Sequence, residues 1–170
     1  GELLQIPMVG DIQISVEQHF EIVRRKTGFL FSASCRLGGV LRGASAVEKA
    51  ALEDFGMNLG TAFQLTDDLL DFTSDAEKLG KPVLNDLREG KVTLPLIHAL
   101  RSATAEQREL VVHAVREGHG DFDAIARIVA DNGSIAYSGS LASREVEIAD
   151  RAICELPASV YRDSLLNLLA

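Results

Sequence analysis

Apolar residues recur at steps of three and four along most of this 170-residue chain, which is the spacing of one buried helix face. After Ser15 the pattern predicts a long helix that ends near Gly43. A second long helix is predicted from Ser45 to about Phe72. Since no stretch shows the alternation typical of a β-strand, the sequence predicts an all-α fold.

Residues that cap helices stand at the predicted helix starts. In a capping box, a Ser or Thr and a Gln or Glu three residues later each accept a hydrogen bond from the other's backbone N–H. Three such pairs stand at predicted helix starts: Ser15–Gln18, Ser45–Glu48 and Thr104–Gln107. Turn residues crowd the stretch 73–91, which we predict to be irregular. Helices are expected again in the remaining segments: 93–100, after 104, 122–129, 135–156 and from 157 to the end.

The overall composition excludes some classes of protein. A net charge of −8 argues against nucleic-acid binding, which needs a basic surface to meet phosphates. No apolar run reaches the ~20 residues that a membrane-spanning helix requires. Cys35 and Cys154 lie far apart without metal or redox spacing, which predicts a reduced, cytoplasmic protein. The chain opens at Gly1 without an initiator Met or a helix cap, so we interpret it as a piece of a larger domain.

Three aspartates, Asp67, Asp68 and Asp71, lie near the end of the second long helix. With Gln64 they fall within an arc of roughly 100° on the helix surface. Like charges this close repel each other, and the helix C-terminus disfavours anions. For an isolated cluster, a solvated acidic face is the commoner explanation. Apolar residues on the other sides of this helix favour burial instead, and carboxylate oxygens suit Mg²⁺.

Lysines follow the acidic helix on turn-forming backbone. Lys81 stands between a glycine and a proline, and Lys91 follows Gly90. Each supplies a compact positive charge suited to a diphosphate. Lys26 lies on or beside the buried face of the first long helix, where it extends to water or faces an internal anion. The combination of acids, basic loop and inward lysine favours the anion.

Several of these segments, in this order and spacing, resemble the trans-isoprenyl diphosphate synthases, also called polyprenyl synthetases. The matching stretches span roughly residues 1 to 100: 1–5, 25–28, 63–71, 80–82, 85–87 and 89–96. The resemblance implies that residues 1–170 are the C-terminal part of a single domain, an antiparallel helix bundle of the isoprenoid synthase type that lacks its N-terminal helices. It also implies a homodimer, and the style of the 90–95 segment is similar to medium- or long-chain bacterial synthases.

The resemblance also implies roles for the site residues. The three aspartates form the second of the family's two aspartate-rich motifs: Asp67 binds Mg²⁺ directly, and Asp68 and Asp71 act partly through metal-bound water. The lysines that hold the allylic diphosphate are Lys26, Lys81 and Lys91. The backbone carbonyl of Thr27 and the side-chain oxygen of Gln64 face the allylic cation.

The implied reaction ionises an allylic diphosphate, and the double bond of isopentenyl diphosphate attacks the resulting cation. The released diphosphate then takes the proton, so no side-chain base is required. The first aspartate-rich motif and the basic residues that hold isopentenyl diphosphate are missing, and are expected upstream of Gly1. We therefore expect the isolated piece to be inactive.

Two alternatives share these features. A class I terpene cyclase also uses DDxxD and Mg²⁺ but usually has a downstream Asn/Ser metal motif, where this chain has Lys81 and Lys91. A non-catalytic subunit that regulates a partner synthase tolerates degraded ligands, yet all the aspartates and lysines are present.

The four histidines are interpreted as surface or satisfied core residues: His19, His98, His113 and His119. Asp86 is expected to orient a lysine or to cap a turn.

Overall fold

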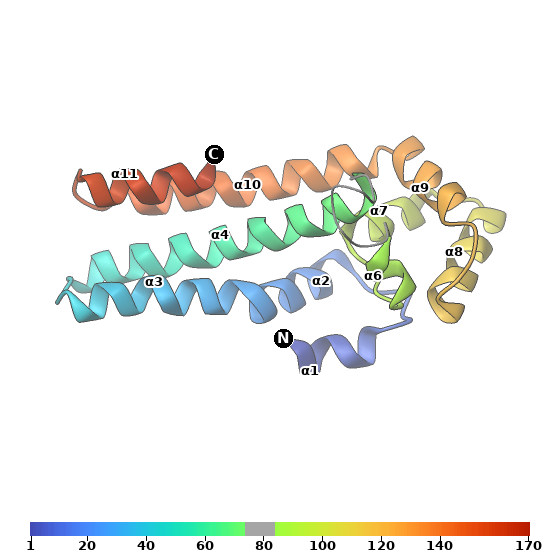
Figure 1. Cartoon of the computed structure of the whole chain (residues 1–170), viewed down its shortest axis with the longest axis horizontal. Helices are drawn as coiled ribbons and strands as arrows, with labels where there is room; N and C mark the ends of the chain where they lie inside the picture. The colour runs from blue at the N-terminus through green and yellow to red at the C-terminus, as the bar shows by residue number, and fades with distance from the viewer. Residues whose placement is uncertain (74–83) are drawn as a thin grey trace. The chain divides into compact units, whose positions relative to one another are not determined.

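The computed structural model describes residues 1–73 and 84–170, and helices are the only regular structure within them (Figure 1). The first part of the chain forms α1 (Glu2–Gln5), η1 (Ile6–Met8), α2 (Val16–Val23), η2 (Arg24–Gly28), α3 (Phe29–Leu41) and α4 (Ala46–Thr73). The second part forms α6 (Asn85–Arg88), α7 (Leu94–Ser102), α8 (Ala105–Glu117), α9 (Phe122–Asp131), α10 (Ser134–Cys154), α11 (Val160–Leu166) and η3 (Asn167–Leu169). The predicted all-α class is confirmed.

All three capping boxes form as predicted. Ser15 and Gln18 exchange hydrogen bonds of 2.8 and 3.2 Å at the start of α2. The pairs Ser45–Glu48 and Thr104–Gln107 do the same before α4 and α8. Each box satisfies backbone N–H groups that have no partner within the helix. Local sequence therefore fixes where these helices begin.

The first long helix differs from its prediction in one respect. Between α2 and α3 the backbone of residues 24–28 winds as a π-helix, η2, which carries Lys26 and Thr27. Such wider turns are rare and often occur at functional sites. The stretch 73–91, predicted to be irregular, also contains the short helix α6, whose start depends on a distant residue.

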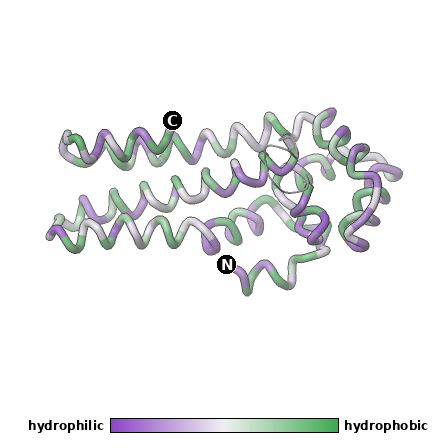
Figure 2. The backbone as a smooth tube through the Cα atoms, in the orientation of Figure 1, coloured by the Kyte–Doolittle hydropathy of each residue, from purple (hydrophilic) through white to green (hydrophobic). Residues whose placement is uncertain are grey.

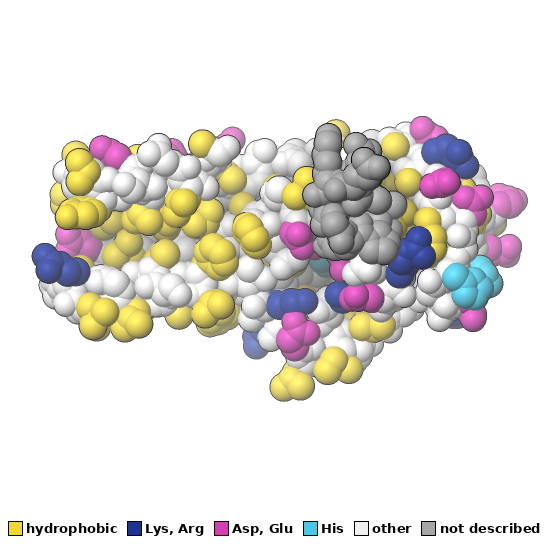
Figure 3. All heavy atoms as spheres, in the orientation of Figure 1, with side chains coloured by type: hydrophobic (Ala, Val, Ile, Leu, Met, Phe, Trp, Pro, Cys, Tyr) yellow, Lys and Arg dark blue, Asp and Glu magenta, His cyan; other side chains and the backbone are white. Residues whose placement is uncertain are grey.

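The chain divides into two compact units, of which the first contains Gly1, Val23–Gln64 and Leu141–Ala170. Its core centres on Phe55 of α4 and on Ala149 and Ile153 of α10, all fully buried. Helices α3 and α4 approach closely at Gly56, where a Cβ would lie 2.6 Å from the carbonyl oxygen of Phe31. The glycine permits this contact because it has no side chain. Figure 3 shows hydrophobic side chains gathered on one face of this unit, over α3, α4 and α11.

The second unit contains Glu2–Ile22 and Leu65–Ser140. Its larger core is built mainly from α7, α8 and α9, with fully buried Leu96, Val111, Ile125 and Val129. Hydrophobic and hydrophilic residues alternate along these helices, as amphipathic packing requires (Figure 2). Across the described residues, no helix combines the length and the apolar character needed to span a bilayer.

Candidate functional site

The three predicted site aspartates lie in the last two turns of α4 but differ sharply in exposure. Asp67 is exposed, whereas Asp68 and Asp71 are only 3% and 1% exposed. The sequence prediction that this acidic segment is packed among helices therefore holds for two of the three. A buried carboxylate is costly unless hydrogen bonds or charges compensate it, so each buried aspartate must have partners.

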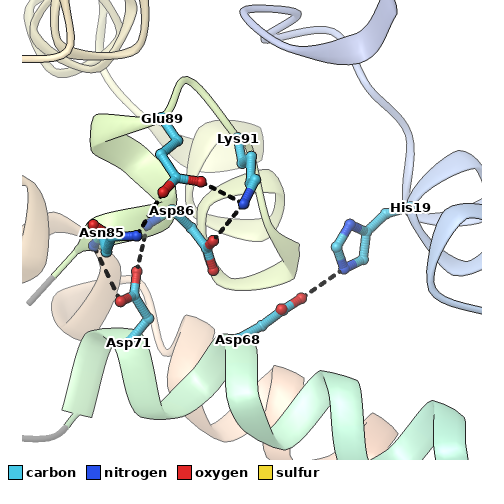
Figure 4. A network of polar contacts seen from close by, with 7 residues as sticks. All are labelled: His19, Asp68, Asp71, Asn85, Asp86, Glu89 and Lys91. Carbon is cyan, nitrogen blue, oxygen red and sulfur yellow. Dashed lines mark hydrogen bonds and ion pairs between the residues drawn. The ribbon is translucent and has the colours of Figure 1, made fainter. Parts of the chain in front are cut away.

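Asp68 is paired with His19, which reaches it from α2 (Figure 4). The distance from His19 Nε2 to Asp68 Oδ2 is 3.0 Å, and both side chains are buried. Each side chain thereby gives the other a polar partner in the interior. The interpretation of His19 as a satisfied core residue is confirmed. Its partner was not predicted, although its place four residues before the buried Val23 was a signal that it faces inward.

Asp71 accepts hydrogen bonds from the start of α6. Its Oδ1 accepts from the N–H of Asn85 at 3.1 Å, and its Oδ2 accepts from the N–H of Asp86 at 3.1 Å. Its backbone carbonyl also accepts from the N–H of Leu84 at 3.1 Å. Asp71 therefore joins the end of α4 to the segment that leads to Lys91.

Lys91 is held by two carboxylates of that segment (Figure 4). Its Nζ lies 2.6 Å from Glu89 Oε2 and 3.3 Å from Asp86 Oδ1. Asn85 in turn donates to Glu89 Oε1 at 2.8 Å, which fixes that carboxylate. The expectation that Asp86 orients one of the lysines is confirmed for Lys91.

The electrostatics of this cluster favour a cation. Burial raises the pKa of Asp86, and the charges of Asp68 and Asp71 raise it further, while Lys91 acts in the opposite direction. Burial acts to lower the pKa of Lys91, but its contacts with Glu89 and Asp86 outweigh burial and raise it. Lys91 is therefore charged at neutral pH, in a region whose aspartates repel one another.

The predicted site residues Thr27 and Gln64 both lie in the first unit. The hydroxyl of Thr27 donates to Gln64 Oε1 at 2.8 Å, from η2 to α4. Arg24, in the same π-helix η2, makes an ion pair with Glu145 of α10. Its Nη2 lies 3.6 Å from the buried Oε2 of Glu145. The resemblance gave Thr27 and Gln64 separate roles, and the structure joins them by a direct contact.

The remaining predicted residues are placed as follows. Lys26 lies in η2 of the first unit, and Lys81 lies outside the described residues. His98 forms a 3.0 Å contact with Ser134 and stacks on Tyr137, whereas His113 and His119 are exposed, as interpreted from the sequence.

The carboxylates at the end of α4 provide part of the oxygen ligands that a magnesium ion needs. Within residues 1–73 and 84–170, no three His, Cys, Asp or Glu side chains converge into a ready metal cage. Magnesium, however, is usually held by one or two carboxylates and completes its shell with water and substrate phosphates. The exposed Asp67 beside the buried Asp68 provides such carboxylates. Burial first, and then the charges of Asp68 and Asp71, raise the pKa of the nearby Asp86.

The described residues thus form an all-helical fold in which an acidic helix end lies beside a lysine-bearing segment. The family model described as Polyprenyl synthetase matches residues 1–131. The chain belongs to the polyprenyl synthetase family.

Known relatives agree with this assignment. The chain is 39% identical over 170 residues to the octaprenyl diphosphate synthase of Escherichia coli K12, covering 99% of this chain and 53% of that protein. It is 36% identical over 169 residues to the all-trans-nonaprenyl-diphosphate synthase (geranyl-diphosphate specific) of Rhodobacter capsulatus, covering 99% of this chain and 52% of that protein. The chain thus spans about half the length of the curated relatives it matches.

Solved structures share the fold. A decaprenyl diphosphate synthase from Rhodobacter capsulatus superposes with a TM-score of 0.90 at 30% identity, covering 99% of this chain and 53% of that one. A polyprenyl synthase from Caulobacter crescentus, complexed with calcium and isoprenyl diphosphate, gives 0.91 at 34% identity, covering 99% and 52%. The predicted isoprenoid synthase type of bundle is confirmed.

Proposed function

We propose that the protein containing this chain condenses an allylic diphosphate with isopentenyl diphosphate to give an all-trans polyprenyl diphosphate. Membership of the polyprenyl synthetase family supports the reaction class. The observation that carries the proposal is the cluster at the end of α4, where buried Asp68 and Asp71 lie beside an ion-paired Lys91. A buried group of like charges in this family fits a site for a metal and a diphosphate.

Magnesium is the proposed cofactor, held by Asp67 and Asp68 with Asp71 as the third aspartate of the motif. When bound, it neutralises the departing diphosphate and so favours cleavage of the allylic C–O bond. His19 fixes the carboxylate of Asp68 through its 3.0 Å contact. A carboxylate oriented in advance binds the metal with less loss of conformational freedom.

The lysines are proposed to hold the diphosphate. Lys26, Lys81 and Lys91 place ammonium groups against its oxygens, where charge grows as the C–O bond breaks. Lys91 is already positioned by Asp86 and Glu89. Gln64 presents its side-chain oxygen, and Thr27 its backbone carbonyl, to the allylic cation. The Thr27 hydroxyl fixes the orientation of the Gln64 amide.

We further propose that this piece is inactive alone and that the rest of the domain supplies the first aspartate-rich motif. The relatives are about twice as long as the chain, in keeping with this view. Large apolar residues left exposed on α3 and α4 are those that further helices would cover: Phe29, Leu30, Leu37, Leu41, Val47 and Phe63. The assembled enzyme is proposed to be a homodimer in the cytoplasm, where the free thiols of Cys35 and Cys154 stay reduced.

The test is an assay of the full-length protein with isopentenyl and farnesyl diphosphates, with products sized by chromatography. Lys91→Met is expected to lower kcat/KM about a hundredfold, because it removes a charge that stabilises the leaving group. Lys49→Met, a lysine in the first half of α4, is the matched control and is expected to retain activity. The proposal is wrong if the full-length protein forms no elongated product, or if both variants lose activity equally.

A further inference from the structure

The start of α6 has no cap of its own. The helix has only four residues, and its first backbone N–H groups have no partner within it. Leu84, at the N-cap position, adopts the left-handed conformation with φ 57° and gives no side-chain hydrogen bond. Among the described residues it is the only non-glycine residue with a positive φ. A β-carbon disfavours this conformation, so something outside α6 must hold it.

Asp71 at the end of α4 provides what α6 lacks. Its three oxygens accept hydrogen bonds from three consecutive N–H groups, those of Leu84, Asn85 and Asp86, each at 3.1 Å. The residue is 1% exposed. A negative carboxylate facing free N–H groups at a helix start is a strong, charge-assisted arrangement.

The other two aspartates of the motif are placed differently. Asp67 is exposed, whereas Asp68 is buried and contacts His19 through Oδ2. Magnesium keeps several waters when it binds protein carboxylates, so it needs an accessible oxygen. Both carboxylate oxygens of Asp71 are buried and already bonded to backbone.

We propose that Asp71 is a positioning residue that holds α6, and through it Lys91, and that it is not a magnesium ligand. This inference rests on the proposed function for what Lys91 does. It changes the role expected for the third aspartate: the exposed Asp67 is the accessible carboxylate for the metal, and Asp71 links the metal-binding helix to the diphosphate-binding loop.

The link from Asp71 to Lys91 is short and stiff. Asp86, whose N–H bonds Asp71, contacts Lys91 Nζ through its carboxylate and accepts the Lys91 N–H through its carbonyl at 2.9 Å. At the far end of α6, the guanidinium of Arg88 lies 4.0 Å from the centre of the Phe122 ring. With that end anchored, release of the Asp71 contacts displaces Asp86 and so moves the ammonium of Lys91.

Amide hydrogen exchange in the full-length, metal-free protein tests the anchor directly. Asp71→Asn keeps the shape but leaves one acceptor where there were two, so exchange at Asn85 and Asp86 is expected to quicken about fivefold. Asp67→Asn removes the same charge from the same helix and is expected to leave these amides unchanged. Equal protection in both variants would overturn the inference.

The wild-type protein gives a second test that needs no variant to fold. On addition of Mg²⁺ with inorganic pyrophosphate, the amides of Asn85 and Asp86 are expected to keep or gain protection, because Asp71 stays on α6. Loss of protection would mean that the carboxylate leaves α6 for the metal, and the inference would be wrong.

Kinetics separate the two roles. Asp71→Asn is expected to raise KM for the allylic diphosphate about tenfold while the Mg²⁺ concentration for half-maximal rate changes less than about twofold. Asp67→Asn is expected to raise the Mg²⁺ requirement about tenfold. If Asp71→Asn instead matches Asp67→Asn, the residue is a ligand. If the full-length protein has no prenyltransferase activity but the exchange results hold, the proposed function fails and the structural role of Asp71 stands.

Discussion

The Thr27 hydroxyl donates a 2.8 Å hydrogen bond to the side-chain oxygen of Gln64, across η2 and α4. In this contact the hydroxyl is the donor and Gln64 Oε1 is the acceptor, so the amide oxygen is turned toward η2. The π-helical winding of η2 brings the hydroxyl to that position. A residue proposed to stabilise the allylic cation is thus held in place before any substrate binds.

Removing that hydroxyl tests its value. Thr27→Val keeps the shape of the side chain but removes the hydroxyl that donates to the Gln64 oxygen, which costs about 1 kcal/mol of stability. In the full-length enzyme, kcat is expected to fall about tenfold with little change in KM, since the cation forms only on the way to the transition state. Thr27→Ser retains the donor and is expected to behave like the wild type. A change in KM with an unchanged kcat would contradict this role.

The contact between His19 and Asp68 predicts a stability effect. His19→Ala removes one partner of the buried Asp68 carboxylate, and the free energy of unfolding is expected to fall by about 1–3 kcal/mol. His113→Ala, at an exposed histidine, is the control and is expected to change stability by less than about 0.5 kcal/mol. Urea denaturation of the full-length variants measures both. An equal effect of the two substitutions would show that the buried pair contributes little.

Sequence alone predicted the parts of the fold that depend on neighbours along the chain. The capping boxes at Ser15, Ser45 and Thr104 and the long helices that follow them rest on contacts three or four residues apart. The acidic residues of α4 and the orientation of Lys91 by Asp86 were also within reach, because spacing and turn chemistry pointed to them.

The features that sequence missed depend on residues far apart in the chain. The first N–H groups of α6 donate to Asp71, which lies fourteen residues before Asn85. His19 meets Asp68 across a separation of 49 residues, which no local pattern encodes. Propensity also disfavoured α6, because its N-cap residue is a leucine in the left-handed conformation. Tertiary contacts decided each of these cases.

The raised pKa of Asp86 predicts that the stability of the protein depends on pH. Its pKa in the folded protein lies above the ordinary value of 3.8, chiefly because the carboxyl is buried. Its ionisation therefore costs more in the folded state than in the unfolded state, and stability is lost as pH rises through this range. Asp86→Asn is expected to raise the melting temperature at pH 7 relative to the wild type, and to lose this advantage below pH 3.8.

Melting curves of both proteins between acidic and neutral pH measure this difference. Lys91 keeps Glu89 as a partner in the variant, so its charge is not stranded. Glu53→Gln provides the control, since its carboxylate pairs with Arg36 at the exposed surface. A melting temperature for Asp86→Asn below that of the wild type at pH 7 would mean that the ion pair with Lys91 outweighs the cost of burial.

The close approach of α3 and α4 makes a prediction about glycines. A Cβ at position 56 would meet the carbonyl oxygen of Phe31 at 2.6 Å, and backbone cannot move aside as a flexible side chain can. Gly56→Ala is therefore expected to push the helices apart and to lower stability by about 1–3 kcal/mol. Gly38, also inside a helix, has no atom within 4 Å of its Cβ direction. Gly38→Ala is expected to raise stability by about 0.5–1 kcal/mol, because alanine favours helix. Opposite signs from the same substitution in two neighbouring helices would show that packing sets the cost at Gly56, whereas a stabilising Gly56→Ala would refute the close helix contact.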